Sequence, residues 1–117
     1  VLRAVVGRAV CAAGLHPSLG LHHHNRYNAY CLADDLMEPF RPLIDAAVVE
    51  HVGAYGPDAP LDRIGKQTLL EAILPRYRAD GEVRTLFDLC SRTAVSLAKV
   101  FLKESDRLDY PKNLCDA

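Results

Sequence analysis

The sequence lacks several features that would assign it to a common class of protein. Its 117 residues contain no apolar run as long as the roughly 20 residues that a membrane-spanning helix needs. The apolar start, "VLRAVVGRAVCAAG", contains two arginines and has no signal-peptide cleavage pattern, so we interpret it as a core helix. We therefore expect a cytoplasmic protein with no membrane partner.

Cysteine pairs at metal-binding spacing and a strong net charge are also absent. The four cysteines lie far apart and form no C-x-x-C motif, which indicates free thiols and argues against a zinc site. We interpret Cys11, Cys31 and Cys90 as small core residues. The net charge of -1 gives no global attraction to nucleic acid, so a nucleic-acid partner would have to meet a local basic face.

Internal repeats, low-complexity tracts and strong strand alternation are missing as well, whereas helical patterns are frequent. The composition, 50% hydrophobic and 25% charged, is typical of a single globular domain. The fold class that we predict is all-α, an irregular helical bundle of about four main helices. Apolar periodicity, the Pro39 kink and a Thr68–Glu71 capping box place these helices at residues 1–13, 25–38 continuing beyond Pro42 to 52, 66–78 and 82–105.

The stretch "GLHHHNRYNAYCLADDLMEPFRP" combines three consecutive histidines with an acidic helical run. Asp35 and Glu38 are three residues apart, so their carboxylates would lie side by side on a helix and repel each other by a few tenths of a kcal/mol. Carboxylates with an imidazole suit Mg²⁺ or Mn²⁺ better than a thiolate-seeking metal. A solvated loop and an ordinary amphipathic helix would give the same pattern, and the spacing alone does not decide between them.

A longer run carries a resemblance to a known family. The sequence "AAGLHPSLGLHHHNRYNAYCLADDLMEPFRPLID", with its unusual "DLMEPFRP", resembles the signature of the CRISPR spacer-acquisition integrase family, the first of the Cas protein series, most closely in its type II form. The final "LDYPKNL" fits the same family less sharply. The resemblance implies an all-helical catalytic domain of a metal-dependent DNA integrase and endonuclease. Such an enzyme joins protospacer DNA into the CRISPR array during antiviral defence.

The resemblance also implies site residues. The family's metal site would use Glu38 and, from the preceding loop, His23, with Mg²⁺ or Mn²⁺ as the cofactor. His22 or His24 remains an alternative ligand, because this loop differs in length among family members. Asp35 occupies the position of a second functional acid, which makes His23, Glu38 and Asp35 the expected catalytic residues.

The sequence departs from the family pattern at its start. The family's first catalytic glutamate and its N-terminal β-rich domain have no counterpart here, so we expect residues 1–117 to be a single helical domain, a fragment of the catalytic domain that is inactive alone. The intact protein is expected to form a homodimer and to bind the small dimeric second Cas protein.

The implied reaction is attack by a DNA 3′-hydroxyl on a phosphodiester of the repeat, with the metal as Lewis acid. The double-stranded DNA partners would be the protospacer and the CRISPR repeat. Arg92, Lys99 and Lys103 fall within an arc of about 40° on the last predicted helix and are candidate phosphate contacts. Arg41 would hold a carboxylate or contact DNA. For Arg92, Lys99 and Lys103 a solvated helix face is the alternative interpretation, and for Arg41 it is a salt bridge on the helix surface.

Two other functions are compatible with parts of the sequence. A different helical metal-dependent phosphohydrolase would be expected to contain an adjacent His-Asp pair, which is missing here. A non-catalytic helical scaffold that binds DNA or protein would need none of the metal ligands.

Overall fold

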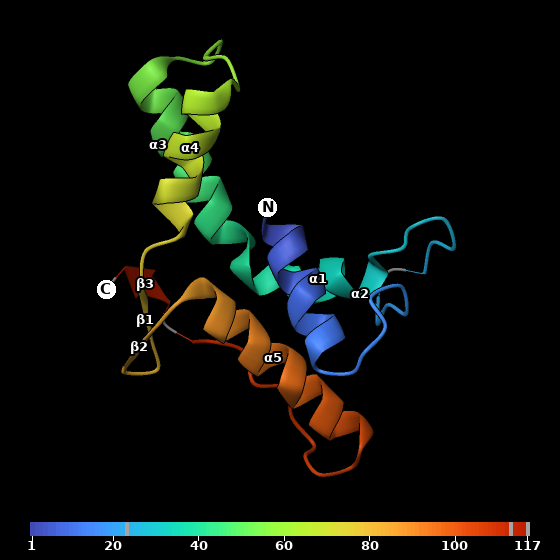
Figure 1. The fold of residues 1–117 in the computed structure, drawn as a ribbon. Coiled ribbons are helices and arrows are strands. Elements are labelled where there is room, and N and C mark those ends of the chain that lie inside the picture. The colour runs from blue at the N-terminus through green and yellow to red at the C-terminus, as the bar shows by residue number, and fades with distance from the viewer. Residues whose placement is uncertain (23, 113, 117) are drawn as a thin grey trace.

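The computed structural model describes residues 1–22, 24–112 and 114–116 and is built mainly from helices (Figure 1). The helices are α1 (Leu2–Ala12), α2 (Cys31–Met37), the short 3₁₀ turn η1 (Glu38–Phe40), α3 (Arg41–Tyr55), α4 (Arg63–Ile73) and α5 (Leu86–Phe101). The strands are β1 (Tyr77–Ala79), β2 (Glu82–Arg84) and β3 (Cys115–Asp116). The predicted all-α class is confirmed, and a small sheet is added to it.

The core forms where α1, α2 and α5 pack together (Figure 1). Apolar residues at helical spacing place one face of each helix inside. The largest buried side chains are Val6 and Val10 of α1, Leu32 and Leu36 of α2, Phe40 of η1, Tyr77 of β1 and Leu89 of α5. This core fixes the rotation of α2, the helix that carries the acidic residues of interest.

The helices α3 and α4 form an antiparallel hairpin that projects away from this core (Figure 1). The radius of gyration is 15.4 Å, whereas a compact domain of this length would have about 13 Å. No helix in the described residues is both long and apolar enough to cross a membrane.

Two predicted helix boundaries are confirmed. Gly14 follows the end of α1 with φ of +81°, a conformation that favours glycine and ends a helix. The kink at Pro39 is present: α2 stops at Met37, η1 holds the proline, and α3 starts at Arg41.

The second predicted helix begins later than residue 25. The side chains of Asn25 and Asn28 accept hydrogen bonds from the backbone N–H of Tyr27 and Tyr30, both at 2.9 Å. Such local side-chain bonds form turns that compete with a helix, so α2 begins only at Cys31.

The third predicted helix is displaced toward the N-terminus, and its predicted capping box is wrong. Asp62 caps α4 by accepting a hydrogen bond from the Gly65 N–H at 2.8 Å. The Thr68 hydroxyl instead donates to the Ile64 carbonyl within the helix. The helix ends at Ile73, shortly before Pro75, and residues 77–79 form β1.

The last predicted helix is too long at both ends. Thr85 caps α5, so the helix begins at Leu86, and residues 82–84 pair with β1 across a turn at Asp80 and Gly81. At the other end α5 stops at Phe101. Lys103, with φ of +59°, therefore lies beyond the helix and does not share a helical face with Arg92 and Lys99.

Candidate metal and DNA-binding site

The acidic side chains of α2 and η1 have different environments, although they are close in sequence. Asp35 is buried, with 7% of its surface exposed, and its Oδ2 accepts hydrogen bonds from the backbone N–H groups of Leu21 (2.6 Å) and His22 (2.9 Å). Charge-assisted bonds of this kind are about twice as strong as those between neutral groups. Asp35 therefore attaches the histidine loop to α2.

Glu38 lies one helical turn further along and faces solvent. Its side chain is 49% exposed and forms an ion pair with Arg41 Nη1 at 3.0 Å. An exposed pair of this kind is worth at most about 1 kcal/mol, so it can be exchanged for a stronger partner. Arg41 thus contacts a carboxylate, which is one of its two predicted roles.

Asp34, which the sequence analysis did not single out, connects two helices. Its carboxylate accepts two hydrogen bonds from the Arg3 guanidinium, both at 2.7 Å, and one from Asn28 Nδ2 at 2.9 Å. Asn28 thus attaches the turn before α2 to the same carboxylate. The bidentate pair fixes the start of α1 against α2.

The predicted imidazole ligands are only partly described. His22 and His24 are exposed, and His23 lies outside the described residues, so its role stays a prediction. Among the residues that the structure describes, no group of three or more His, Cys, Asp or Glu side chains is arranged to hold a metal ion. The donor types still fit a hard divalent cation, because the outward carboxylate of Glu38 lies one turn from the aspartate that binds the histidine loop.

Tyr110 lies beside this region, on the segment that follows α5. Burial, and in second place the charge of Asp35, raise the pKa of the Tyr110 hydroxyl. The segment after α5 therefore passes close to the aspartate that attaches the histidine loop.

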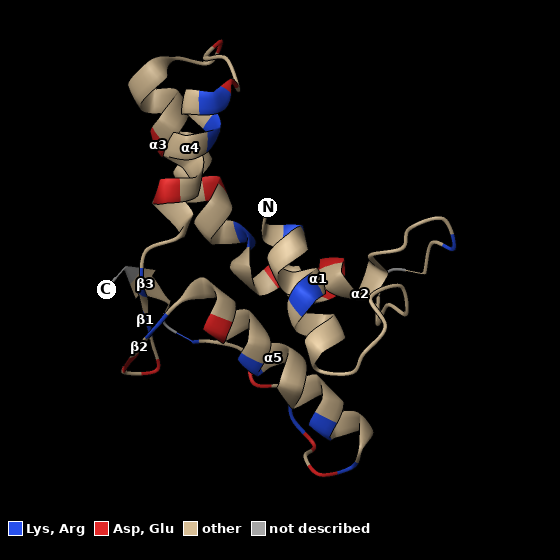
Figure 2. Ribbon diagram, in the orientation of Figure 1, with Lys and Arg blue, Asp and Glu red and all other residues tan. Residues whose placement is uncertain are grey.

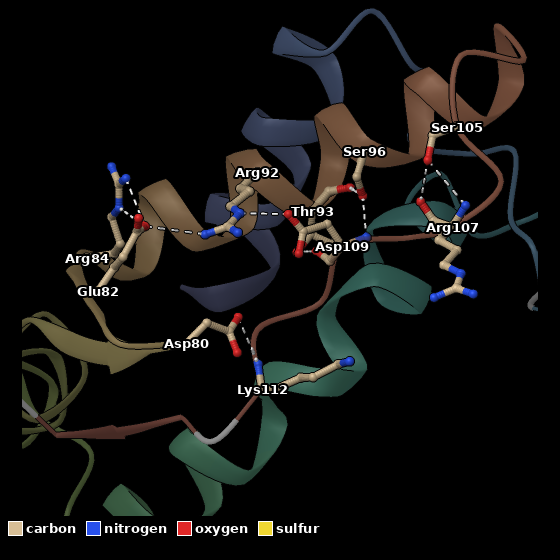
Figure 3. A network of polar contacts seen from close by, with 10 residues as sticks. All are labelled: Asp80, Glu82, Arg84, Arg92, Thr93, Ser96, Ser105, Arg107, Asp109 and Lys112. Atoms are coloured by element: carbon tan, nitrogen blue, oxygen red, sulfur yellow. Dashed lines mark hydrogen bonds and ion pairs between the residues drawn. The ribbon is translucent and has the colours of Figure 1, made fainter.

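That segment is bound to α5 by a polar network (Figure 3). The Thr93 hydroxyl donates to the Asp109 carbonyl at 3.0 Å, and Ser96 Oγ accepts a hydrogen bond from the Asp109 N–H at 2.8 Å. Further along, the Lys112 N–H reaches Asp80 at 3.5 Å. These bonds order the segment against the helix.

Arg92, a predicted DNA contact, belongs to the same network (Figure 3). Its Nε donates to Asp109 at 2.7 Å, and its Nη1 lies 3.6 Å from Glu82. The guanidinium is therefore neutralised by two carboxylates, although its side chain is still 44% exposed. A phosphate would have to displace one of them.

Lys99 and Arg107 are freer cations. In the described parts of the chain neither of them forms an ion pair, and both line a hollow of about 480 Å³ between α5 and the segment that follows it. Lysines and arginines are otherwise spread over several elements and do not gather on one helix (Figure 2). The sequence analysis named Lys99 but missed Arg107, because Arg107 lies outside any helical pattern.

A larger apolar cavity of about 590 Å³ lies between the start of α1 and the α3–α4 hairpin. Leu2, Met37, Ile44, Leu69 and Leu70 contribute to its lining. Arg41, the ion-pair partner of Glu38, also lines this cavity.

Comparison with known protein families matches the first part of the chain. The family model described as "CRISPR associated protein Cas1" matches residues 1–55. The CRISPR-associated endonuclease Cas1 of Neisseria meningitidis serogroup C (strain 8013) is 49% identical over 49 residues, which cover 42% of this chain and 16% of that protein. The CRISPR-associated endonuclease Cas1 of Korarchaeum cryptofilum (strain OPF8) is 39% identical over 57 residues, which cover 49% of this chain and 17% of that protein.

A solved structure matches nearly the whole chain. It is titled "Casposase bound to integration product" and has a TM-score of 0.76 at 22% identity, over 92% of this chain and 36% of the casposase chain. At this identity the match shows a shared fold. The family-model match covers residues 1–55, which contain the histidines, Asp35 and Glu38, and the predicted resemblance to the first Cas protein family is confirmed.

Proposed function

We propose that this chain is the helical catalytic part of a Cas1-type DNA integrase and endonuclease of CRISPR adaptation. The observation that carries the proposal is the attachment of the histidine loop to α2 by Asp35, one turn before the exposed carboxylate of Glu38. The family match covers these same residues. The match to a casposase bound to an integration product supports the fold, and integration is the same class of reaction.

The reaction would be the joining of protospacer DNA to the CRISPR repeat by attack of a 3′-hydroxyl on a phosphodiester. Mg²⁺ or Mn²⁺, when bound, would supply Lewis-acid stabilisation of the charge that develops on the phosphate. Glu38 and His23 would hold the ion, with His22 or His24 as the alternative imidazole. Arg41, which pairs with Glu38 in this structure, would be available to a DNA phosphate if Glu38 served as a metal ligand.

The DNA surface of this proposal includes Arg41, Arg92, Lys99 and Lys103. Lys99 and Lys103 are exposed, whereas Arg92 is tied to Asp109 and Glu82 and would contribute less. Each phosphate that is neutralised would add about -0.9 to the slope of log binding constant against log salt concentration.

The larger assembly is also a proposal. The matched segments cover 16% and 17% of the two Cas1 relatives, and the structural match covers 36% of the casposase chain. We infer that residues 1–117 act as one helical domain, to which an earlier helix would add a further glutamate. An N-terminal β-rich domain would supply the homodimer contact. The small dimeric second Cas protein would be the partner.

The test compares Glu38→Gln with Glu50→Gln in the intact protein that contains this segment. Glu50 is an exposed carboxylate of α3, outside the candidate site, and it serves as the matched control. Because Glu38 would be a metal ligand, Glu38→Gln is expected to lower integration of a labelled protospacer about a hundredfold or more. Glu50→Gln is expected to integrate normally.

Normal integration by Glu38→Gln would overturn the proposal. Retained DNA binding in that inactive variant would separate a catalytic defect from a general loss of structure. If the protein were a non-catalytic scaffold, the wild type itself would not integrate the labelled protospacer.

A further inference from the structure

We propose that Asp35 is a positioning residue, which orients the histidine loop by binding two of its backbone amides. This inference rests on the proposed function, because the loop and Glu38 define the site concerned. In this view the Asp35 carboxylate serves to bind backbone N–H groups of the protein itself.

The first argument is the bonding of a single oxygen atom. Asp35 Oδ2 lies 2.6 Å from the Leu21 nitrogen and 2.9 Å from the His22 nitrogen. A carboxylate oxygen that accepts two N–H groups has used both of its in-plane lone pairs, so Oδ2 is occupied without any cation. The two donors are consecutive residues, so one atom fixes the direction of the loop.

The second argument is the rigidity of the support. Leu32 and Leu36, on either side of Asp35 in α2, are buried in the core with 2% and 1% of their surfaces exposed. The backbone N–H of Leu32 also donates to the Pro17 carbonyl at 2.7 Å. The loop is therefore attached to α2 at two places, at Pro17 and again at Leu21 and His22, directly before His23 in the sequence.

The third argument is the relation to Glu38. Asp35 and Glu38 are three residues apart, across the junction of α2 and η1, so their Cβ atoms lie on adjacent turns, about 5–6 Å apart. A loop bonded to Asp35 is thereby held at a fixed distance from the exposed carboxylate. Loss of the bond would leave Glu38 in place and release the loop.

The first experiment needs no metal and no DNA. Amide hydrogen exchange of Leu21 and His22 is measured by NMR in this chain, in the presence of EDTA, for the wild type, Asp35→Ala and Glu38→Gln. We expect both amides to be protected in the wild type, to exchange at least about tenfold faster in Asp35→Ala, and to be unchanged in Glu38→Gln. Unprotected amides in the wild type, or no change in Asp35→Ala, would overturn the proposal.

A second variant covers the case in which Asp35→Ala unfolds, which far-UV circular dichroism would reveal. Asparagine can place its one acceptor oxygen where Oδ2 lies, but it carries no charge, and hydrogen bonds to a charged acceptor are about twice as strong as neutral ones. Asp35→Asn is therefore expected to accelerate the exchange of both amides severalfold. If both amides were as well protected in this variant as in the wild type, the positioning role would be contradicted.

The second experiment uses the intact protein and separates positioning from ligation. In Asp35→Asn the ligands would remain but would be less well oriented, so the Mn²⁺ concentration for half-maximal integration is expected to rise about ten- to a hundredfold. The rate at saturating Mn²⁺ should then approach that of the wild type. Glu38→Gln should not be rescued by added Mn²⁺. Failure of Mn²⁺ to rescue Asp35→Asn would favour direct ligation and sink the inference.

The two proposals fail in different ways. If Glu38→Gln integrates normally while Asp35→Ala still releases the two amides, the proposed function fails and the positioning of the loop stands. If Asp35→Ala leaves the amides protected but abolishes integration, the function stands and the positioning fails.

Discussion

At the scale of single residues, the cysteines differ sharply in their surroundings. Cys11 and Cys115 are exposed, whereas Cys31 and Cys90 are buried. Burial raises the pKa of the Cys90 thiol to about 12. Because the thiolate is the reactive species, the folded protein keeps Cys90 protonated and unreactive near neutral pH.

A labelling experiment tests this difference. Brief iodoacetamide treatment at pH 8, followed by mass spectrometry, is expected to modify Cys11 and Cys115 and to leave Cys90 unmodified. The same reaction in denaturant, where the thiol is no longer buried, should label Cys90 as well. Labelling of Cys90 in the folded chain at the rate seen in denaturant would show that the α1–α5 interface opens readily.

The candidate site shows how far residues can be assigned from sequence. The pairing of Asp35 and Glu38 on one side of a helix follows from their spacing, and the exposure of Glu38 is compatible with its expected role. The bonds of Asp35 to Leu21 and His22 depend on the path of a loop, which helical periodicity does not specify. The role of Asp34 was missed for the same reason, because Arg3 is 31 residues away in sequence.

At the scale of elements, α5 and the segment after it form a unit held by buried polar groups. Ser96 is 8% exposed; its Oγ donates to the Thr93 carbonyl at 2.7 Å and accepts from the Asp109 N–H. A buried N–H that loses its acceptor costs about 1–3 kcal/mol. The hydroxyl of Ser96 is therefore expected to matter far more than a serine hydroxyl elsewhere on the same helix.

Two substitutions on α5 test this. Ser96→Ala is expected to lower the free energy of unfolding by about 1–2 kcal/mol in urea titrations, because the Asp109 amide loses its acceptor. Ser91→Ala is the control, since Ser91 makes no side-chain hydrogen bond in the described structure and its change should stay within about 0.5 kcal/mol. Equal effects of the two substitutions would contradict a role for the network in stability.

Prediction of the elements succeeded where glycine or proline restricts the backbone, and it failed at helix starts set by side-chain turns and caps and at the sheet. The stop at Gly14 and the kink at Pro39 are encoded by backbone restrictions of one residue each. The sheet was not predicted, because its strands are two or three residues long and so too short to show an alternation of apolar and polar residues. One of them, β3, pairs with β1 across more than thirty residues of sequence.

At the scale of the whole molecule, the structure consists of a packed core and a less buried hairpin. In α5 seven residues are buried, whereas α3 buries only Ala47 and α4 buries Gly65 and Ile73. Helices that bury little apolar surface open more often than those of a core. The hairpin is therefore the part of the fold that is expected to unfold first.

Hydrogen exchange followed by mass spectrometry measures this directly. Peptides from α3 and α4 are expected to exchange at least about tenfold faster than peptides from α5, since the free energy of local opening is smaller there. The comparison of α3 with α5 is well matched, because the helices have 15 and 16 residues. Equal protection of the two helices would mean that the hairpin is stabilised by contacts beyond those of its own pair.

The strand order β2-β1-β3 has a further consequence for any shortened form of the protein. The middle strand, β1, is flanked on one side by its hairpin partner β2 and on the other by residues from the end of the chain. Removal of those last residues would uncover a row of unpaired amides and carbonyls along β1, a template onto which an extended segment of another molecule can add. Trimming this tail would thus open a second free edge in the sheet, kept short by the three residues of β1, a change distinct from any loss of catalysis.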